Sequence, residues 1–249
     1  MAGRSRAHPV RASPGPVGWD RIYAERADDE LSWFQSHPHR SVRWIVRLAR
    51  PDDPVLDVGA GQSALAACLV REGFRHVAVI DLSRRAIARS RRRAGPAARS
   101  IRFLVGDVTS RRIRLPRVRV WHDRALFHFL TDPADRRRYR GNLGRALVPG
   151  GVAVFATFAP DGPTRCSGRP VRRYGPRALA RELGPEFRRI RLARERHRTP
   201  WGTVQRFLYT AWRRIPSGEG PARSGRPGSR PTGRARAPLR RGRVPASGR

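Results

Sequence analysis

The feature that most constrains this chain is the segment Val55-Leu56-Asp57-Val58-Gly59-Ala60-Gly61, in which a short apolar run leads directly into two glycines. A helix-type pattern of apolar residues follows from Ser63. Glycines at this point permit a tight turn and a close approach of the backbone to a ligand, and the first N–H groups of the helix can bind that ligand. The spacing Gly59-x-Gly61-x-x-Ala64 also fits the dinucleotide fingerprint, whose third position tolerates alanine. The segment therefore predicts a strand, a ligand-binding turn and a helix.

Strand-like and helix-like patterns alternate along the chain. We expect strands at 54–58, 76–80, 101–105, 118–121 and 151–158, and helices at 63–72, 83–93, 133–147 and 177–183. Strands at 187–192 and 205–212 follow each other without a helix between them. This order predicts an α/β fold with a doubly wound, mostly parallel sheet that ends in an antiparallel hairpin. Amphipathic segments at 19–25 and 41–48 are expected to cap the sheet.

Acidic residues stand at the ends of the first three predicted strands, at Asp57, Asp81 and Asp107. A carboxylate beside the glycine turn suits a ligand with a positive group there, such as the amino group and sulfonium of S-adenosylmethionine (SAM), better than a pyrophosphate. Asp81 is placed to accept hydrogen bonds from ribose hydroxyls, and Asp107 to meet the adenine amino group. The alternative is that each acid only caps a helix or turn, which is less probable for three acids at three successive strand ends. The predicted cofactor-binding residues are Asp57, Gly59, Ala60, Gly61, Asp81, Leu82, Asp107 and Val108.

The chain resembles the class I SAM-dependent methyltransferases in four motifs along residues 19–214. They are Asp57-Val-Gly-Ala-Gly61, Asp81, Gly106-Asp107 and Leu147-Val-Pro-Gly-Gly151. The resemblance implies SAM as the cofactor and a Rossmann-like seven-stranded sheet with an antiparallel last strand. Ser63 departs from the pattern, because many members have a third glycine there. Residues 33–35, 121–130 and 161–168 also look like a bacterial subgroup with a loose likeness to thiopurine methyltransferases.

Methyl transfer from a sulfonium is an in-line displacement, for which the protein supplies alignment and a site without water. By analogy with the family, the end of the fourth strand faces both methionine and acceptor. His122 and Asp123 are therefore the candidate catalytic residues, which would orient the acceptor or take its proton. The alternative is that Asp123 caps the following turn, while His122 packs against the sheet or faces solvent.

Two further residues are candidates for contact with the substrate. The resemblance places Trp33 in a lid over the cofactor, although aromatic residues in such a pattern are more often part of a core. Cys166 stands in a polar loop after the fifth predicted strand, where loops often carry function, and the alternative is an inert thiol. His37 and His39 form a close pair, but no cysteine or supporting acid stands nearby, so we predict no metal site.

The chain is strongly basic. All 54 basic residues are arginine, against 19 acidic residues, which gives a formal net charge of +35. Two interpretations are open: a GC-rich coding bias, and a nucleic-acid partner attracted by the positive field. The arginines are spread along the whole chain and no zinc-finger spacing or RNP-type aromatic pattern accompanies them, which favours the bias. Non-specific binding of nucleic acid through the arginines is expected in either case.

The composition also predicts the domain organisation. Residues 1–18 and 215–249 are rich in glycine, proline and arginine and poor in large apolar residues, so we expect both to be disordered around a domain at 19–214. Two cysteines exclude a disulfide scaffold, and no apolar run is long enough to span a bilayer. No secretory signal is recognisable, and the expected location is the cytoplasm.

The function predicted from the sequence is methyl transfer from SAM to a small molecule with a thiol, amine or hydroxyl acceptor. One alternative is a nucleic-acid or protein methyltransferase, although the Asn/Asp-Pro-Pro-aromatic turn of enzymes that methylate exocyclic base nitrogens is replaced here by His122-Asp123-Arg124-Ala125. A SAM-binding module without catalysis is another. A dinucleotide-dependent oxidoreductase is disfavoured by Asp57.

Overall fold

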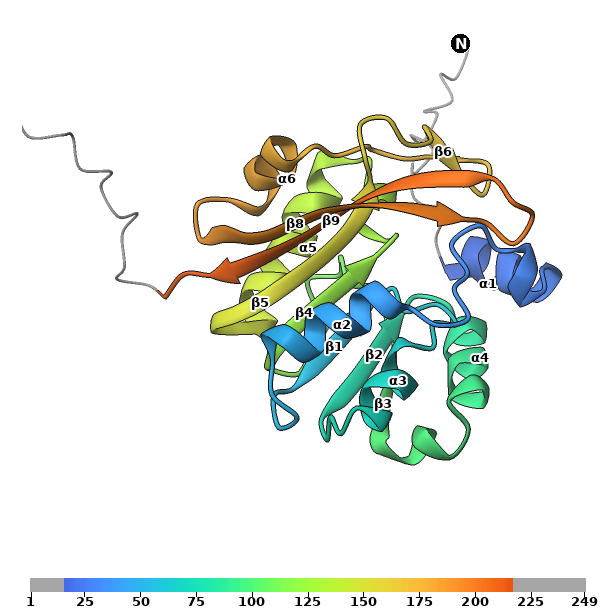
Figure 1. The fold of residues 1–249 in the computed structure, drawn as a ribbon, viewed down its shortest axis with the longest axis horizontal. Helices are drawn as coiled ribbons and strands as arrows, with labels where there is room; N and C mark the ends of the chain where they lie inside the picture. The colour runs from blue at the N-terminus through green and yellow to red at the C-terminus, as the bar shows by residue number, and fades with distance from the viewer. Residues whose placement is uncertain (1–15, 217–249) are drawn as a thin grey trace, which may run out of the picture. The chain divides into compact units, whose positions relative to one another are not determined.

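The computed structural model describes residues 16–216 of the chain, and these residues contain one seven-stranded sheet in the order β3-β2-β1-β4-β5-β9-β8 (Figure 1). The strands are β1 (Val55–Val58), β2 (Val77–Asp81), β3 (Ile101–Val105), β4 (Val118–Arg124), β5 (Leu147–Phe158), β8 (Phe187–Arg198) and β9 (Val204–Arg214). The helices are α1 (Pro16–Glu25), α2 (His39–Leu48), α3 (Leu65–Arg71), α4 (Arg84–Ala94), α5 (Pro133–Ala146) and α6 (Pro176–Leu183). Short 3-10 helices lie at η1 (Asp28–Glu30), η2 (Gly95–Ser100) and η3 (Phe127–Phe129).

The sheet has the predicted doubly wound arrangement. Strand β1 pairs in parallel with β2 on one side and β4 on the other, so the strand order reverses at β1. The last strand, β9, runs antiparallel to β5, and β8 pairs antiparallel with β9 at the edge of the sheet. The fold class predicted from the sequence is confirmed. In such sheets, ligands bind at the carboxyl ends of the strands, where the order reverses.

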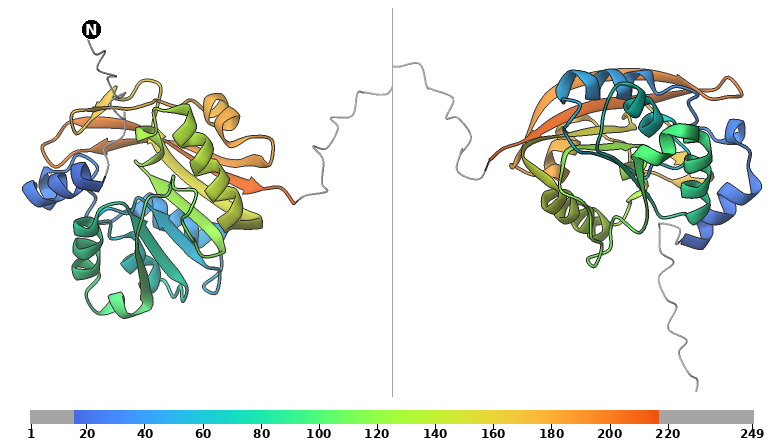
Figure 2. Two further views of the ribbon diagram at one scale, coloured as in Figure 1. Left: turned by 180° about the vertical axis from the view of Figure 1, so that it is seen from behind. Right: turned by 90° about the horizontal axis from the view of Figure 1, so that it is seen from below.

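Successive side chains of the central strands pack alternately into two hydrophobic cores, one on each face of the sheet. Leu56 and Val58 of β1 pack in the core that α5 and α6 cover. Val55 packs with α2 and α3 on the opposite face. The views in Figure 2 show these helices on the two faces. Asp57 lies on the same side of β1 as Val55 and is buried, although its side chain is charged. A buried carboxylate in a central strand needs hydrogen-bond or ion-pair partners at the end of β1.

The structure differs from the expected elements at several boundaries. Strand β8 continues to Arg198, past the predicted end at Leu192, because an edge strand tolerates charged side chains that face solvent. Residues 165–170 form a two-stranded ribbon, β6 (Arg165–Cys166) and β7 (Arg169–Pro170), where a loop was expected. The short strands lack an apolar pattern that would reveal them.

The predicted disordered segments need correction at their inner ends. Helix α1 begins at Pro16, so residues 16–18 are helical. Pro16 suits the first turn of a helix, where no backbone N–H is required. At the other end, the N–H of Ile215 donates to the carbonyl of Glu186 at 2.8 Å, so Ile215 belongs to the folded unit. The rest of both segments, residues 1–15 and 217–249, lies outside the described residues and their disorder stays a prediction.

Candidate active site

The turn after β1 requires glycine at two positions. Gly59 and Gly61 have φ angles of +64° and +56°, in the left-handed region that favours glycine. A Cβ atom on Gly61 would lie 2.5 Å from the hydroxyl oxygen of Tyr23, and one on Gly59 would overlap the side chain of Leu126. The backbone of the turn is therefore closely packed between α1 and the segment that follows β4.

Two adjoining cavities open at the carboxyl ends of the strands. The larger has a volume of about 160 Å³ and the smaller about 40 Å³, and Trp33, Gly59 and Arg124 line both. Of the residues predicted to bind the cofactor, the larger cavity contains Gly59, Asp81, Leu82, Asp107 and Val108. The smaller contains Asp57, Gly59 and Ala60, together with His122. All the predicted cofactor-binding residues except Gly61 therefore line at least one of the two cavities, and their contact with a cofactor stays a prediction.

Asp81 links the end of β2 to the glycine turn. One carboxylate oxygen accepts from the N–H of Gly61 and the other from the N–H of Ser83, each at 2.8 Å. Burial raises the pKa of Asp81 to about 6, although both backbone hydrogen bonds lower it. Each oxygen keeps a second lone pair, so the carboxylate can still accept from ribose hydroxyls. Gly61 therefore helps to hold the Asp81 carboxylate in place through its N–H.

Asp107 and Val108 follow β3 and line the larger cavity. One oxygen of Asp107 accepts from the N–H and the hydroxyl of Thr109, both at 2.7 Å. This is the turn-capping arrangement that the sequence left open as an alternative. It uses only one of the two carboxylate oxygens, so capping and ligand binding are compatible at Asp107.

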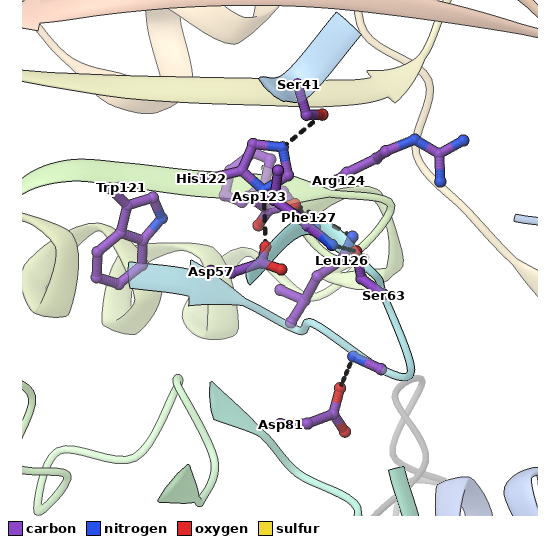
Figure 3. Close-up of polar contacts among 12 residues, drawn as sticks. Ser41, Asp57, Ser63, Asp81, Trp121, His122, Asp123, Arg124, Leu126 and Phe127 are labelled. Carbon is purple, nitrogen blue, oxygen red and sulfur yellow. Dashed lines mark hydrogen bonds and ion pairs between the residues drawn. The ribbon is translucent and has the colours of Figure 1, made fainter. Parts of the chain in front are cut away.

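Asp57, His122 and Ser41 lie in a row above the end of β1 (Figure 3). The Oδ1 atom of Asp57 is 2.7 Å from Nδ1 of His122, and Nε2 of His122 is 2.8 Å from Oγ of Ser41. All three side chains are buried. Both ring nitrogens of His122 therefore have protein partners. The Oδ2 atom of Asp57 is also buried and has no hydrogen-bond partner among the described residues.

Arg124, at the end of β4, brings a positive charge to both cavities. Its Nη1 donates to the carbonyl of Trp33 at 2.7 Å, and its Nε donates to the hydroxyl of Tyr209 at 3.2 Å. Its Nη2 is buried without a partner in the described part of the chain. The sequence analysis did not select Arg124, Ser41 or Tyr209. One arginine among 54 carries no signal by itself, and the other two come from α2 and β9, far away along the chain.

Asp123, the second candidate catalytic residue, lies outside both cavities. Its side chain is fully buried and lines neither cavity. One oxygen accepts from the N–H groups of Leu126 and Phe127, and the other accepts from the hydroxyl of Tyr139 at 2.6 Å. Burial raises the pKa of Asp123 to about 6. Asp123 instead caps the turn after β4, which was the alternative interpretation.

The two candidate substrate-contacting residues are placed differently. Trp33 lines both cavities, as a lid residue should. Cys166 lines neither; its thiol is buried in an apolar cluster beside β9 and lies 3.5 Å from the hydroxyl of Ser32. Burial raises the pKa of the Cys166 thiol to about 11, so it stays protonated and unreactive at neutral pH. These contacts favour the alternative interpretation of Cys166 as an inert thiol.

Residues 16–216 contain neither a metal-ligand cluster nor a membrane-spanning helix. Among these residues, no group of three or more His, Cys, Asp or Glu side chains is arranged to hold a metal ion. The rings of His37 and His39 pack with centroids 4.0 Å apart and line neither of the two cavities. None of the helices in this part of the chain is long and apolar enough to cross a membrane.

Comparisons with known proteins agree with this geometry. Residues 55–151 match the family model of the methyltransferase domain. A curated relative from Danio rerio, the eEF1A lysine and N-terminal methyltransferase, is 24% identical over 147 residues. That match covers 57% of this chain but only 21% of the relative, so the chain spans about a fifth of that protein's length.

Solved structures share the fold. A protein studied for the conversion of a disulfide bond into a thioacetal group during echinomycin biosynthesis has a TM-score of 0.66 and 20% identity, over 80% of this chain and 93% of that one. The N-methyltransferase NodS from Bradyrhizobium japonicum, in complex with S-adenosylhomocysteine, has a TM-score of 0.59 and 17% identity, over 80% and 97%. The glycopeptide N-methyltransferase MtfA, in complex with sinefungin, has a TM-score of 0.58 and 17% identity, over 77% and 99%.

The resemblance that the sequence predicted is confirmed by the family model and by the fold. Both also agree with the predicted enzyme class and with SAM as its cofactor. The narrower likeness to thiopurine methyltransferases stays a prediction. Residues 55–151 of this chain match the methyltransferase domain model, and the chain has the Rossmann-like fold of the class I SAM-dependent methyltransferases.

Proposed function

We propose that the chain binds SAM across the two cavities and transfers its sulfonium methyl group to a small-molecule acceptor. The observation that carries this proposal is a pair of opposite charges that each keep one atom unpaired. Asp57 and Arg124 line the smaller cavity, and each has a buried polar atom that no described residue pairs. Burying such groups is costly unless a ligand pairs with them. The ammonium and carboxylate of the methionine end of SAM supply one partner for each charge.

The larger cavity suits the adenosine half of the same ligand. Asp81 is available to the ribose hydroxyls, and Asp107 and Val108 are available to the adenine ring, as the sequence predicted. A dinucleotide fits less well, because its pyrophosphate would meet the carboxylate of Asp57 beside the glycine turn. The site thus favours SAM over NAD by the sign of the charge at the end of β1.

The remaining wall of the larger cavity is aromatic, which supports a small acceptor with apolar surface. The rings of Trp19 and Trp33 pack edge to face with centroids 6.1 Å apart, and Phe129 packs against Trp19 at 5.0 Å. Such a wall excludes water and aligns the acceptor with the sulfonium, which are the contributions that in-line methyl transfer needs from the protein. SAM itself supplies the reactive methyl group when bound.

Calorimetric titration of the purified protein tests the cofactor. We expect S-adenosylhomocysteine to bind with micromolar affinity at moderate salt and NAD to show no binding. Transfer of label from labelled SAM to a library of thiols, amines and hydroxyl compounds then tests the acceptor. Binding of NAD alone would overturn the proposal, and transfer only to protein or nucleic acid would overturn its acceptor class.

A second candidate partner is single-stranded nucleic acid, because of the hairpin of β8 and β9. Trp201 at its tip is 57% exposed, and Arg196 and Arg206 stand opposite each other in the register of the two strands. Exposed aromatic rings that stack on bases, next to arginines that contact phosphates, are the usual means of binding single strands. We expect Trp201→Ala to weaken binding of a fluorescent oligonucleotide several-fold, with S-adenosylhomocysteine affinity unchanged. Equal oligonucleotide affinity in both proteins would remove this candidate.

A further inference from the structure

A continuous series of hydrogen bonds joins Arg124 and Asp57, the two charged residues of the smaller cavity. Nε of Arg124 is 3.2 Å from the hydroxyl of Tyr209, which is 3.4 Å from Oγ of Ser41. Oγ of Ser41 is 2.8 Å from Nε2 of His122, and Nδ1 of His122 is 2.7 Å from Oδ1 of Asp57. The five side chains come from α2, β1, β4 and β9, so the series joins elements that lie far apart along the chain.

The donors and acceptors fix the direction of this series. A guanidinium only donates, so Arg124 donates to the oxygen of Tyr209, and an ionised carboxylate only accepts, so His122 donates from Nδ1 to Asp57. If the hydroxyl of Tyr209 donates to Ser41, the hydroxyl of Ser41 donates to Nε2 of His122, and every hydrogen has one acceptor. This arrangement requires a neutral His122 with its proton on Nδ1.

The other protonation states leave a buried group unpaired. With His122 protonated at both nitrogens, Nε2 donates to Ser41 and the Ser41 hydroxyl turns to Tyr209. The Tyr209 hydrogen is then left without an acceptor among the described residues. With the proton on Nε2 alone, the lone pair of Nδ1 faces the carboxylate of Asp57. A buried unpaired hydrogen-bonding group is costly, so both states are disfavoured.

We propose that Ser41, His122 and Tyr209 form a directed hydrogen-bond chain that holds His122 as the neutral Nδ1–H tautomer and positions Asp57 and Arg124 for the two charged groups of an amino-acid ligand. The positioning part rests on the proposed function; the tautomer does not. His122 is then a positioning residue. Both of its nitrogens are engaged, so it does not take a proton from the acceptor, in contrast to the role expected from the sequence.

The surroundings of the chain favour the protonated phenol that it needs. Burial raises the pKa of Tyr209, and the charge of Arg124 opposes that shift only in part. Arg40 lies over the Tyr209 ring at 5.6 Å and is itself paired with Glu195 at 2.8 Å. Tyr209 therefore stays a donor at neutral pH.

Nitrogen-15 NMR of the histidine rings tests the chain without any cofactor. We expect the His122 signal at pH 7, identified by its loss in His122→Asn, to show a proton on Nδ1 and a bare Nε2. A doubly protonated ring, or a proton on Nε2, in the unchanged protein would overturn the proposal.

Titration with S-adenosylhomocysteine tests the positioning role. We expect Ser41→Ala to weaken binding about tenfold and Tyr209→Phe somewhat less, because each leaves a buried group of the chain unpaired. The matched control is Tyr174→Phe, which removes a buried hydroxyl without a partner among the described residues and should leave affinity unchanged. Unchanged affinity in folded Ser41→Ala would overturn the positioning role. If the unchanged protein does not bind S-adenosylhomocysteine, the proposed function fails, while the NMR result still decides the tautomer.

Discussion

At the scale of single residues, the site is defined by charges that the protein leaves incomplete. The Asp57 carboxylate is bound on one oxygen by His122 and unpaired on the other, and Arg124 uses two of its three nitrogens. A folded protein bears the cost of such groups where a ligand completes them. The contribution of each charge to ligand affinity can therefore be measured with two ligands, one that carries the complementary charged group and one that lacks it.

Replacing Arg124 should remove binding energy only from ligands with a carboxylate. We expect Arg124→Met to weaken binding of S-adenosylhomocysteine about a hundredfold, since charge-assisted hydrogen bonds contribute about 1.5–3 kcal/mol each. Binding of 5′-methylthioadenosine, which has no amino-acid group, should stay the same. Arg119→Met, at the start of β4 and away from both cavities, is the control. Equal losses for both ligands would show that Arg124 supports the fold of the site instead.

Asp123 should matter for stability and not for binding. Asp123→Ala leaves the hydroxyl of Tyr139 and the N–H groups of Leu126 and Phe127 without their acceptor. We expect a loss of about 3 kcal/mol in the free energy of unfolding, measured by urea denaturation. The folded fraction should bind S-adenosylhomocysteine as before. A stable variant that has lost binding would return Asp123 to the list of site residues.

The pH dependence of cofactor binding should follow Asp81. Its pKa in the folded protein is raised to about 6, above the ordinary 3.8, so the carboxyl group favours folding below pH 4 and this contribution is lost as pH rises through 6. Ligand binding has the opposite sign, because ribose hydroxyls need the ionised carboxylate. S-adenosylhomocysteine should bind about tenfold more weakly at pH 5 than at pH 7.5. Asp81→Asn should bind weakly and lose this dependence; an unchanged pH profile in that variant would assign the dependence to another group.

At the scale of elements, the glycine turn is the part that tolerates least change. Gly61→Ala places a methyl group against the hydroxyl of Tyr23 and also strains a backbone with φ of +56°. Gly73→Ala is a matched control, because φ is +88° there and no atom lies within 4 Å of the added carbon. We expect Gly61→Ala to lower both the melting temperature and the affinity for S-adenosylhomocysteine, and Gly73→Ala to lower only the melting temperature. Recovery of affinity in Gly61→Ala/Tyr23→Phe would identify the steric contact; equal effects of the two single variants would contradict it.

The elements were predictable where a local pattern determines them. Ser83 begins the predicted helix 83–93, and its hydroxyl caps α4 by accepting from the N–H of Ala86 at 3.0 Å. The extension of β8 to Arg198 could not be foreseen, because its residues are strand-forming only through pairing with β9. The same limit applies to Ser41 and Tyr209, which reach the site through tertiary contacts between distant parts of the chain.

At the scale of the whole molecule, a few positions in the sequence predicted the fold and the resemblance to the class I SAM-dependent methyltransferases. Asp57, Asp81 and Asp107 were informative because they stand at or just after the ends of the first three strands. Arg124 could not be singled out in the sequence, because it is one of 54 arginines. The catalytic roles of His122 and Asp123 were expected by analogy. The contacts of Asp123 lie in the turn after β4, and the role that we propose for His122 is to position Asp57. The acceptor, which depends on the shape of the aromatic wall, left no comparable mark in the sequence.

The central claim is that the smaller cavity binds a group with both a positive and a negative charge. Calorimetric titration of the unchanged protein with S-adenosylhomocysteine and with 5′-methylthioadenosine tests it most directly, because the two ligands share the adenosine thioether and differ in the amino-acid group. We predict that S-adenosylhomocysteine binds about a hundredfold more tightly. Equal affinities would contradict the account, because Asp57 and Arg124 would then contribute nothing to recognition of the cofactor.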